Sequence, residues 1–408
     1  MNRRELFGIL AGLSCAFAAG PALAQADKPI RVGMTVSSTG PFAPAAQSGF
    51  RGIEIWVDDV NRRGGIEING VKRKVEVVKL DDRSDKTLVP KVYESLINDS
   101  NVDFVFAPFG STLTGAALNV TESKKKFMVI WGASSDALYA QGYKYMISAT
   151  QIAASLVGQT GMRALKEAGV RKVAFAYLDE PYPASQTSSA ADYAKSIGLE
   201  VTMMEKFAKD TKDFSTLLLK AKATGADVFY PSTYIVDQMT IARQMRETNT
   251  NFNAVMMLYG SEPQFLTQAK QDSMYLLSQS IMHPKINWKV TAGMNRADML
   301  KAYETKFAGA QYTADFQTAL AYGAGVIAEQ IIKTAQSLDA EKMKQAALQL
   351  SGKIVTLTGE YKIDETGKQY KNEFVVLQNQ PGGLEVVYPP EVATAKMIYP
   401  VPTFDKRK

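Results

Sequence analysis

Hydrophobic and polar positions follow two repeating patterns along most of this chain. Short apolar runs, typical of buried strands, alternate with longer stretches whose apolar residues recur every three or four positions, typical of amphipathic helices. The first unit is a strand over 30–36, a loop of small polar residues, and a helix with an apolar face of Phe50, Ile53, Val57 and Val60. This alternation predicts an α/β fold with parallel sheets and crossover helices.

The strands and helices form two successive series, which predict two doubly wound, Rossmann-like lobes. We expect strands of the first series at 30–36, 75–80, 102–106 and 127–131, and of the second at 173–177, 201–207, 228–230, 255–258 and 275–282. Two later helices, 295–307 and 316–337, have no strand between them and are expected to return to the first lobe. Three further segments are expected to form antiparallel strands, at 360–363, 374–377 and 385–387.

These elements divide the chain into domains. The predicted first lobe comprises 28–150 plus about 285–358, the second comprises 151–284 plus about 359–388, and 389–408 is a C-terminal tail. A length of 408 residues favours two domains, because single hydrophobic cores stop growing at about 250–300 residues.

Small polar loops follow three strands of the first series, at 37–41, 107–114 and 132–136. In an all-parallel sheet these loops lie side by side at the carboxyl edge, where open α/β sheets bind small ligands. Ser111 and Thr112 precede one helix, and Ser134 and Ser135 hold the same position after the next strand. Hydroxyls and N–H groups at helix N-termini favour an anion such as a carboxylate, although each residue alone could instead cap its helix.

The second series contributes an acid and several tyrosines near its strand ends. Glu262 follows the strand at 255–258 and could pair with a cationic group of a ligand. The tyrosines suggest an aromatic face over the ligand, and they are Tyr177, Tyr182, Tyr230, Tyr234 and Tyr259.

The sequence offers little chemistry for catalysis. His283 is the sole histidine, and no nucleophile or carboxylate has the spacing that would make it part of a triad. A phosphate-binding Walker loop, a G-x-S-x-G elbow and the dinucleotide fingerprint are missing. Asp81-Asp82 could bind a metal, but a solvated turn is favoured because no third ligand is near in sequence. We therefore predict no enzyme activity, no cofactor and no metal site.

The N-terminus predicts export. Arg3 and Arg4 precede an apolar run over 6–19 and a small-residue cleavage site at 22–24, so residues 1–24 are interpreted as a signal peptide for the periplasm. Both the twin-arginine route and general secretion fit this pattern. The one cysteine, Cys15, lies within the signal, so the mature chain is predicted to have no disulfide and no thiolate site.

The arrangement of the basic residues points away from nucleic acids as partners. The chain carries +6 at neutral pH, and its basic runs at 72–74 and 124–126 lack interleaved aromatic residues. Solvated surfaces are the better interpretation of these runs.

Taken together, these residues resemble the branched-chain amino acid (leucine/isoleucine/valine) type of periplasmic solute-binding protein, from about Lys28 to Tyr388. The motifs are S-x-G-P at 38–41, D-x-N-x-x-G-G at 59–65, the strand and aspartates at 77–82, Gly-Ser-Thr at 110–112 and G-x-E at 260–262. The resemblance implies a type I periplasmic binding fold, two lobes joined by a hinge of three crossovers, a ligand between them, and delivery to an ABC permease.

Carried over residue by residue, the resemblance implies that Ser111, Ala133 and Ser135 hold a ligand carboxylate and that Glu262 holds an α-ammonium group. The chain departs from the amino-acid binders at three places. An additional acid is missing at 151–155, an aromatic residue is replaced at 45–47, and Tyr182 is followed by Pro183 in place of glycine.

We therefore expect an exported, monomeric binding protein for a small carboxylate, with an amino acid as the first choice. An aromatic carboxylate and a urea-like or amide-like solute remain open, because the missing acid weakens the case for a zwitterion. A ligand-sensing receptor component remains open as a second class.

Overall fold

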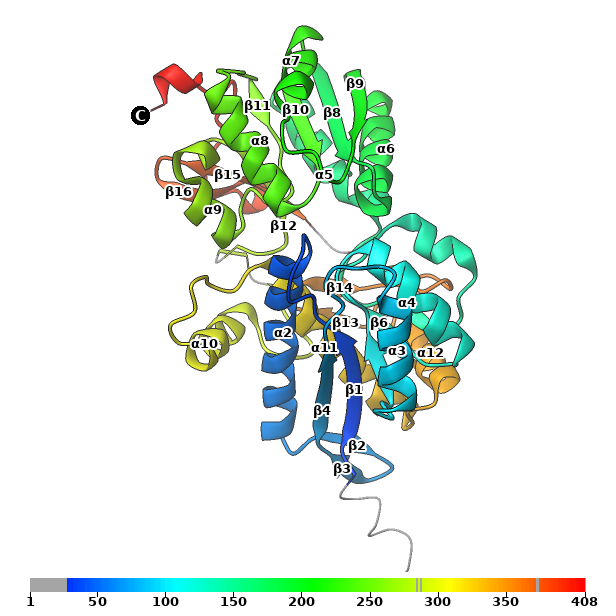
Figure 1. Cartoon of the computed structure of the whole chain (residues 1–408). Coiled ribbons are helices and arrows are strands. Elements are labelled where there is room, and N and C mark those ends of the chain that lie inside the picture. The colour runs from blue at the N-terminus through cyan, green and yellow to red at the C-terminus, as the bar shows by residue number, and fades with distance from the viewer. Residues whose placement is uncertain (1–27, 284, 287, 372–373, 408) are drawn as a thin grey trace, which may run out of the picture.

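The computed structural model describes residues 28–283, 285–286, 288–371 and 374–407, which form two α/β lobes stacked along one axis (Figure 1). Each lobe is built on a parallel sheet, so the predicted fold class is confirmed. The predicted signal peptide lies outside the described residues. In the described part of the chain, no helix combines the length and the apolar character needed to cross a membrane.

The first lobe is organised around a five-stranded parallel sheet with strand order β4-β1-β5-β6-β7. Its strands are β1 (Ile30–Thr35), β4 (Val75–Leu80), β5 (Phe104–Phe106), β6 (Met128–Ile130) and β7 (Met146–Ser148). The central strands β5 and β6 consist wholly of buried residues, because helices cover both faces of the sheet. The prediction omitted β7, whose three residues are too short to show a pattern.

Helices and a hairpin complete the first lobe. Its helices are α2 (Ala43–Arg62), α3 (Val89–Asn98), α4 (Ser111–Ser123), the 3₁₀ turn η1 (Asp136–Gln141), α10 (Arg296–Lys306), α11 (Phe316–Ala335) and α12 (Ala340–Gln349). The predicted return of two late helices to this lobe is correct for α10 and α11, which pack against α2. Asn69-Gly70 forms the turn between β2 (Ile66–Ile68) and β3 (Val71–Arg73), where Asn69 has a positive φ of 50°.

The second lobe extends a parallel sheet with an antiparallel one. Strand order β11-β10-β8-β9 is formed by β8 (Lys172–Leu178), β9 (Glu200–Phe207), β10 (Val228–Ser232) and β11 (Ala254–Val255). A bridge between Met256 and Leu277 leads on to β12 (Leu277–Ser280), β15 (Val375–Gln380) and β16 (Gly383–Tyr388). The helices are α5 (Ala154–Glu167), α6 (Pro181–Ser196), α7 (Ser215–Ala223), α8 (Ile235–Glu247), α9 (Pro263–Ala269) and η2 (Lys270–Ser273).

Two glycines allow α2 and α11 to approach each other closely. A Cβ atom at Gly52 would lie 2.1 Å from the carbonyl oxygen of Thr318, and one at Gly325 would lie 2.4 Å from the Trp56 ring. A side chain at either position would force the helices apart. Both helices are buried along most of this contact, so it forms the centre of the first lobe's core.

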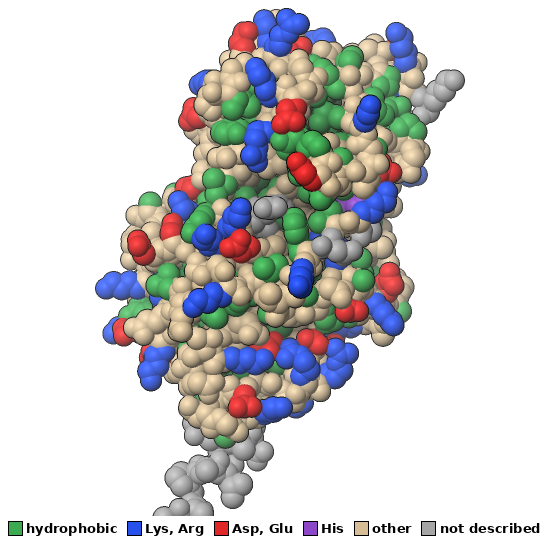
Figure 2. Space-filling view, turned by 180° about the vertical axis from the view of Figure 1, so that it is seen from behind, with side chains coloured by type: hydrophobic (Ala, Val, Ile, Leu, Met, Phe, Trp, Pro, Cys, Tyr) green, Lys and Arg blue, Asp and Glu red, His purple; other side chains and the backbone are tan. Residues whose placement is uncertain are grey.

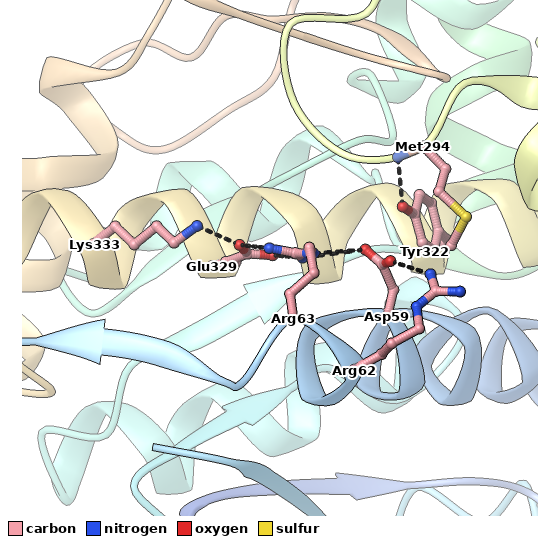
Figure 3. Close-up of polar contacts among 7 residues, drawn as sticks. All are labelled: Asp59, Arg62, Arg63, Met294, Tyr322, Glu329 and Lys333. Carbon is pink, nitrogen blue, oxygen red and sulfur yellow. Dashed lines mark hydrogen bonds and ion pairs between the residues drawn. The ribbon is translucent and has the colours of Figure 1, made fainter. Parts of the chain in front are cut away.

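An ion network closes the far end of the same helix pair (Figure 3). Glu329 of α11 is 2% exposed and accepts two hydrogen bonds from Arg63, each 2.8 Å long, and one from Lys333. Arg63 also contacts Asp59, which binds Arg62 as well. Burial by itself would raise the pKa of Glu329, but the bonds from Arg63 and Lys333 hold it below its ordinary value. The D-x-N-R-R-G-G motif thus fastens α2 to α11.

Arg296 anchors the hinge. Its buried guanidinium donates to the carbonyl oxygens of Ile281 and His283, on one crossing between the lobes, and to that of Leu357 in the first lobe. Burial lowers the pKa of Arg296 to about 10. His283 is also buried, with Nε2 lying 3.1 Å from the carbonyl oxygen of Leu384, so its role here is structural.

Two of the predicted domain boundaries, near 284 and near 358, differ in the structure. Residues from 359 onward were expected in the second lobe, but β14 (Gly359–Tyr361) pairs with β13 (Ile354–Thr356) in the first. Gly367 accepts a hydrogen bond from Ser148 at the end of β7, so the chain enters the second lobe after Lys371. Conversely, Ile286 was expected in the first lobe, but it packs with β15 and β16 of the second. Short apolar strands carry no mark of which sheet they join, which explains the misplacement.

The predicted C-terminal tail is bound to the second lobe, and we call residues 389–407 the C-terminal strap. It contains η3 (Pro390–Val392) and η4 (Phe404–Lys406). The backbone N–H of Val401 donates to the carbonyl of Asn253, next to β11, and that of Ile398 donates to the side chain of Gln378. These bonds fix the strap along the sheet.

The basic runs at 72–74 and 124–126 lie at the surface. The side chains of Lys72, Lys74, Lys124 and Lys125 are exposed. Figure 2 shows one face of the molecule, on which basic and acidic side chains are mixed over both lobes. This mixture matches a solvated surface more closely than a track for a nucleic acid.

Replacing Glu329 by glutamine tests the ion network. The substitution keeps the shape of the side chain but removes the charge that Arg63 and Lys333 neutralise, so we expect the free energy of unfolding to fall by about 1–3 kcal/mol at about pH 7. Folding lowers the pKa of Glu329 below its ordinary value of 4.5. The stabilisation from its charge is therefore complete at pH values above 4.5, and it is lost as the pH falls through the pKa of Glu329 in the folded protein. Denaturant unfolding of both proteins at about pH 7 and about pH 3 measures the difference.

Arg62→Ala is the matched control, because the Arg62 side chain is 72% exposed. We expect it to change the free energy of unfolding by less than about 0.5 kcal/mol. Equal losses in the two variants, or a loss from Glu329→Gln that does not shrink in acid, would contradict the role of the network.

Candidate ligand-binding site

A buried aspartate holds the first predicted loop, which follows β1. Asp82 is fully buried and accepts hydrogen bonds from the hydroxyls of Thr35 and Ser37 and from the backbone N–H of Ser84. Asp81 is exposed. The predicted solvated turn is therefore wrong for Asp82, because polar groups of neighbouring loops replace water around its carboxylate. The hydroxyls of this loop serve its own structure.

The second and third loops border a small cavity between the lobes. The lining side chains come from both lobes and are Phe109, Gly110, Ser111, Gly132, Ser134, Gln151, Tyr182, Tyr234, Leu258, Tyr259, Phe316, Gln317 and Leu320. The cavity encloses about 30 Å³, which is room for about two water molecules. A carboxylate with an alkyl or aryl body is larger than this space, so the lobes must lie further apart to hold it than they do in this structure.

Ser111 is oriented as a hydrogen-bond donor toward this cavity. Its Oγ accepts bonds from the backbone N–H groups of Ser134 and Ser135, at 3.1 and 3.0 Å. A hydroxyl has two acceptor lone pairs, so both are used and its proton remains for another acceptor. Ser111 is 2% exposed and is the first residue of α4. Such a donor suits a carboxylate oxygen.

Helices α4, α6, α8 and α11 all begin at or beside residues that line the cavity. Three of these N-termini have an acid close by: Glu180 before α6, Asp237 in the first turn of α8 and Asp315 before α11. Helix α4 has no side-chain cap and no acid in its first turn. The acid that reaches its first turn is Glu180 of the second lobe, which accepts a hydrogen bond from Thr112. The start of α4 therefore carries no acid of its own, and a helix N-terminus of this kind favours an anion.

Several buried polar atoms on the cavity wall have no hydrogen-bond partner among the described residues. They are Ser134 Oγ, Gln151 Oε1, the hydroxyls of Tyr182 and Tyr234, and Gln317 Nε2. Buried polar groups are normally paired, and leaving one unpaired costs about 1–3 kcal/mol. Their concentration at one cavity indicates a wall built for a polar ligand.

Aromatic side chains form the rest of the wall. Tyr234 packs edge-on against Phe42 with ring centroids 4.9 Å apart, and Tyr259 lies 6.0 Å from Phe316 across the two lobes. Burial raises the pKa of Tyr182, Tyr234 and Tyr259 well above 10. These hydroxyls therefore stay protonated and can act as neutral donors. Of the five predicted tyrosines, Tyr182, Tyr234 and Tyr259 line the cavity together with Phe109 and Phe316. Tyr177 and Tyr230 do not, and the hydroxyl of Tyr230 is bonded to Gln186 and Gln279 instead.

Glu262 lies outside the lining of the cavity. It is 4% exposed, precedes α9, and interacts with Asp315 of the first lobe. Burial and the nearby Asp315 raise its pKa well above 4.5, which favours the neutral form. One carboxyl oxygen, Oε2, has no partner among the described residues. A neutral carboxyl shared with another acid is a poorer partner for an ammonium group than the carboxylate expected from the sequence.

Three other predicted residues lie beside the cavity. Ala133 and Ser135 are buried, and Ser135 contributes its backbone N–H to Ser111 Oγ. Thr112 points across the cleft to the second lobe. The structure thus brings Ser111, Ser134, Tyr182 and Tyr234 together on the wall and places Thr112, Ala133, Ser135 and Glu262 around it.

Comparison with known proteins identifies the family. The family model described as periplasmic binding protein matches residues 29–383. The chain belongs to the periplasmic binding protein family.

Relatives and solved structures refine this assignment. Leu/Ile/Val-binding protein homolog 7 of Brucella abortus is 24% identical over 401 residues, covering 94% of this chain and 97% of the relative. The leucine-binding protein of Thermotoga maritima has a TM-score of 0.77 at 21% identity, covering 89% and 99% of the two chains. A solute-binding protein of an R. palustris ABC transporter, solved with benzoate, has a TM-score of 0.73 at 16% identity, covering 93% and 99%. The Leu/Ile/Val-binding and leucine-binding proteins among them are of the type that the sequence resemblance implied.

Sequence reasoning missed the part of the wall that comes from α11. Phe316, Gln317 and Leu320 reach the cavity from the first turns of a helix distant in sequence. A signal for that helix start was available, because Asp315 and Thr318 form a capping box. The place of that start in the fold depends on tertiary packing.

Polar contacts link the two lobes of this periplasmic binding protein, and we call them the lobe latch. Thr112 of the first lobe donates to Glu180 of the second at 2.7 Å. Asp136 of the first lobe accepts hydrogen bonds from Ser155 at 2.8 Å and Ser185 at 3.0 Å in the second. These residues lie at the rim of the cleft, where water competes when the lobes part.

Thr112→Val tests the latch. The substitution keeps the shape of the side chain and removes one interlobe hydrogen bond worth about 1 kcal/mol, so we expect the ratio of closed to open molecules to fall about fivefold. Small-angle X-ray scattering of the ligand-free protein should then show a larger radius of gyration.

Asp179→Asn serves as the control, because Asp179 pairs with Lys206 at 2.8 Å within the second lobe. It should leave the scattering unchanged. If the curve for Thr112→Val matches that of the parent protein, the latch does not govern closure.

Proposed function

We propose that this protein is exported to the periplasm, captures a small carboxylate between its lobes, and delivers it to an ABC permease without altering it. The observation that carries the proposal is the start of α4, where a helix with no acid in its own first turn presents the Ser111 donor to the cavity. Ser111, Ser134 and the Ala133–Ser135 backbone would hold the carboxylate. Tyr182, Tyr234 and Phe316 would enclose the apolar body.

Among carboxylates, an aromatic or other acid without an ammonium group fits this wall better than an amino acid. Every side chain that the structure describes in the cavity lining is neutral. Glu262 lies outside the lining, and the nearby Asp315 together with burial raises its pKa and favours its neutral form. A buried ammonium group without a carboxylate partner would be unfavourable. The R. palustris protein solved with benzoate shares the fold, which supports testing this class first.

Ligand binding by the mature chain is the first test. Calorimetry should detect binding of benzoate-like acids, whereas branched-chain amino acids, ureas and amides should bind more weakly. Ligand at about a hundred times Kd should also stabilise the fold by about 2.7 kcal/mol in thermal unfolding. Absence of binding by every carboxylate in the panel would contradict the proposal.

Ser111→Ala should weaken binding of the best carboxylate by about 10-fold to 100-fold, because a charge-assisted hydrogen bond is worth about 1.5–3 kcal/mol. Ser123→Ala, at the other end of α4, is the control, since Ser123 donates to the carbonyl of Val120. Calorimetric titration measures both. Equal effects of the two substitutions would argue against a carboxylate at the start of α4.

Glu262→Gln separates the two carboxylate classes. An acid without an ammonium group should bind the variant and the parent protein equally well. A large loss of affinity for an amino acid would instead restore the ammonium role that the family resemblance implies. Uptake of the labelled ligand by vesicles that contain the cognate permease tests delivery, and recovery of unchanged ligand tests the absence of catalysis.

A further inference from the structure

Two spaces meet at the side chain of Tyr234. On one side is the inner cavity of about 30 Å³, and on the other is an outer pocket of about 300 Å³. Tyr234 lines both. The outer pocket is also bordered by residues from both lobes, and they are Gly40, Pro41, Phe42, Leu178, Glu180, Lys209, Asp210, Lys212, Val236 and Asp237.

Aromatic packing holds the Tyr234 ring in place as a partition. The ring is 5% exposed and lies edge-on to Phe42 at 4.9 Å and to Phe109 at 6.3 Å, while Tyr259 is 6.5 Å away. Its hydroxyl has no partner among the described residues and lies 3.8 Å from the position that a Cβ atom at Gly110 would occupy. The phenol end therefore faces the start of α4, and the ring separates the two spaces.

The outer pocket offers room and an apolar floor. Pro41, Phe42, Leu178 and Val236 supply apolar surface, and Val236 is 44% exposed. The charged residues at its border have both signs, so the pocket selects no single charge. An alkyl or aryl extension of a ligand could lie there if the partition were absent.

We propose that Tyr234 sets the length of the ligand by closing the inner cavity toward the outer pocket. This inference rests on the proposed capture of a carboxylate at α4. The ligand class is then a compact carboxylate, and an acid with a long substituent opposite its carboxylate is excluded by the Tyr234 ring. Removing the ring joins the two spaces and admits the longer acid.

The test measures affinity against ligand length by calorimetry. One series is 4-alkylbenzoates of increasing chain length, and the other is straight-chain 2-amino acids of increasing length, so that head group and length vary independently. At least one of the two series should bind the parent protein. Within that series, the affinity of the parent protein should be at least about tenfold lower for the longest member than for the shortest. In the Tyr234→Ala variant, long members should bind more tightly than short ones. The variant should bind the longest member at least about tenfold more tightly than the parent protein does.

Two variants serve as controls. Tyr234→Phe keeps the ring, so the length limit should persist. Tyr182→Ala enlarges only the inner cavity, because Tyr182 does not border the outer pocket, and it should not favour the long members. Tyr234→Leu, which retains apolar packing, repeats the test if Tyr234→Ala unfolds.

The outcomes are distinct. If the parent protein binds long and short members equally, or if neither Tyr234→Ala nor Tyr234→Leu gains affinity for long members, the length role is overturned while carboxylate capture stands. If the parent protein binds no short member of either series, both proposals fail.

Discussion

The structure depends on one geometric constraint: the carboxyl ends of two parallel sheets face each other across a cleft. Each strand that ends there is followed by a helix whose N-terminus must also point into the cleft. The chain places Glu180 and Asp237 at two of these helices, α6 and α8, and Asp315 at α11, which follows another helix but also begins at the cavity. Helix α4 has no acid in its own first turn and meets Glu180 of the second lobe, through Thr112. The proposed anion site rests on this difference between the helices.

The contacts inside the first lobe differ from the contacts between the two lobes, and this difference suits hinge motion. In the first lobe, glycine contacts and the Arg63–Glu329 pair lock α2 to α11, so that lobe can move as a rigid body. At the hinge, Arg296 ties one crossing to the first lobe through the backbone carbonyls of Ile281 and Leu357. Across the cleft, by contrast, the contacts are hydroxyl–carboxylate bonds at the rim and aromatic edges within. Such contacts can be broken and remade without disturbing either core.

Much of the fold could be predicted because strand and helix periods are local properties. The loops after β5 and β6 could also be placed together, since neighbouring parallel strands end at the same edge. Other features depended on contacts between distant segments. Nothing near Glu262 in sequence reveals Asp315 beside it, and the short strand at 359–361 carries no mark of the sheet it joins. The burial of Asp82 was hidden for the same reason, because its partners Thr35 and Ser37 come from another strand end.

The C-terminal strap has a consequence for the use of this protein as a sensor. It carries the end of the chain to the far side of the second lobe, whereas β1 begins at the opposite pole of the first (Figure 1). The hinge lies between these two points, so any change in the angle between the lobes changes the distance between them. A donor and an acceptor fluorophore attached at the two poles would convert ligand capture into an optical signal, and neither label would touch the cavity.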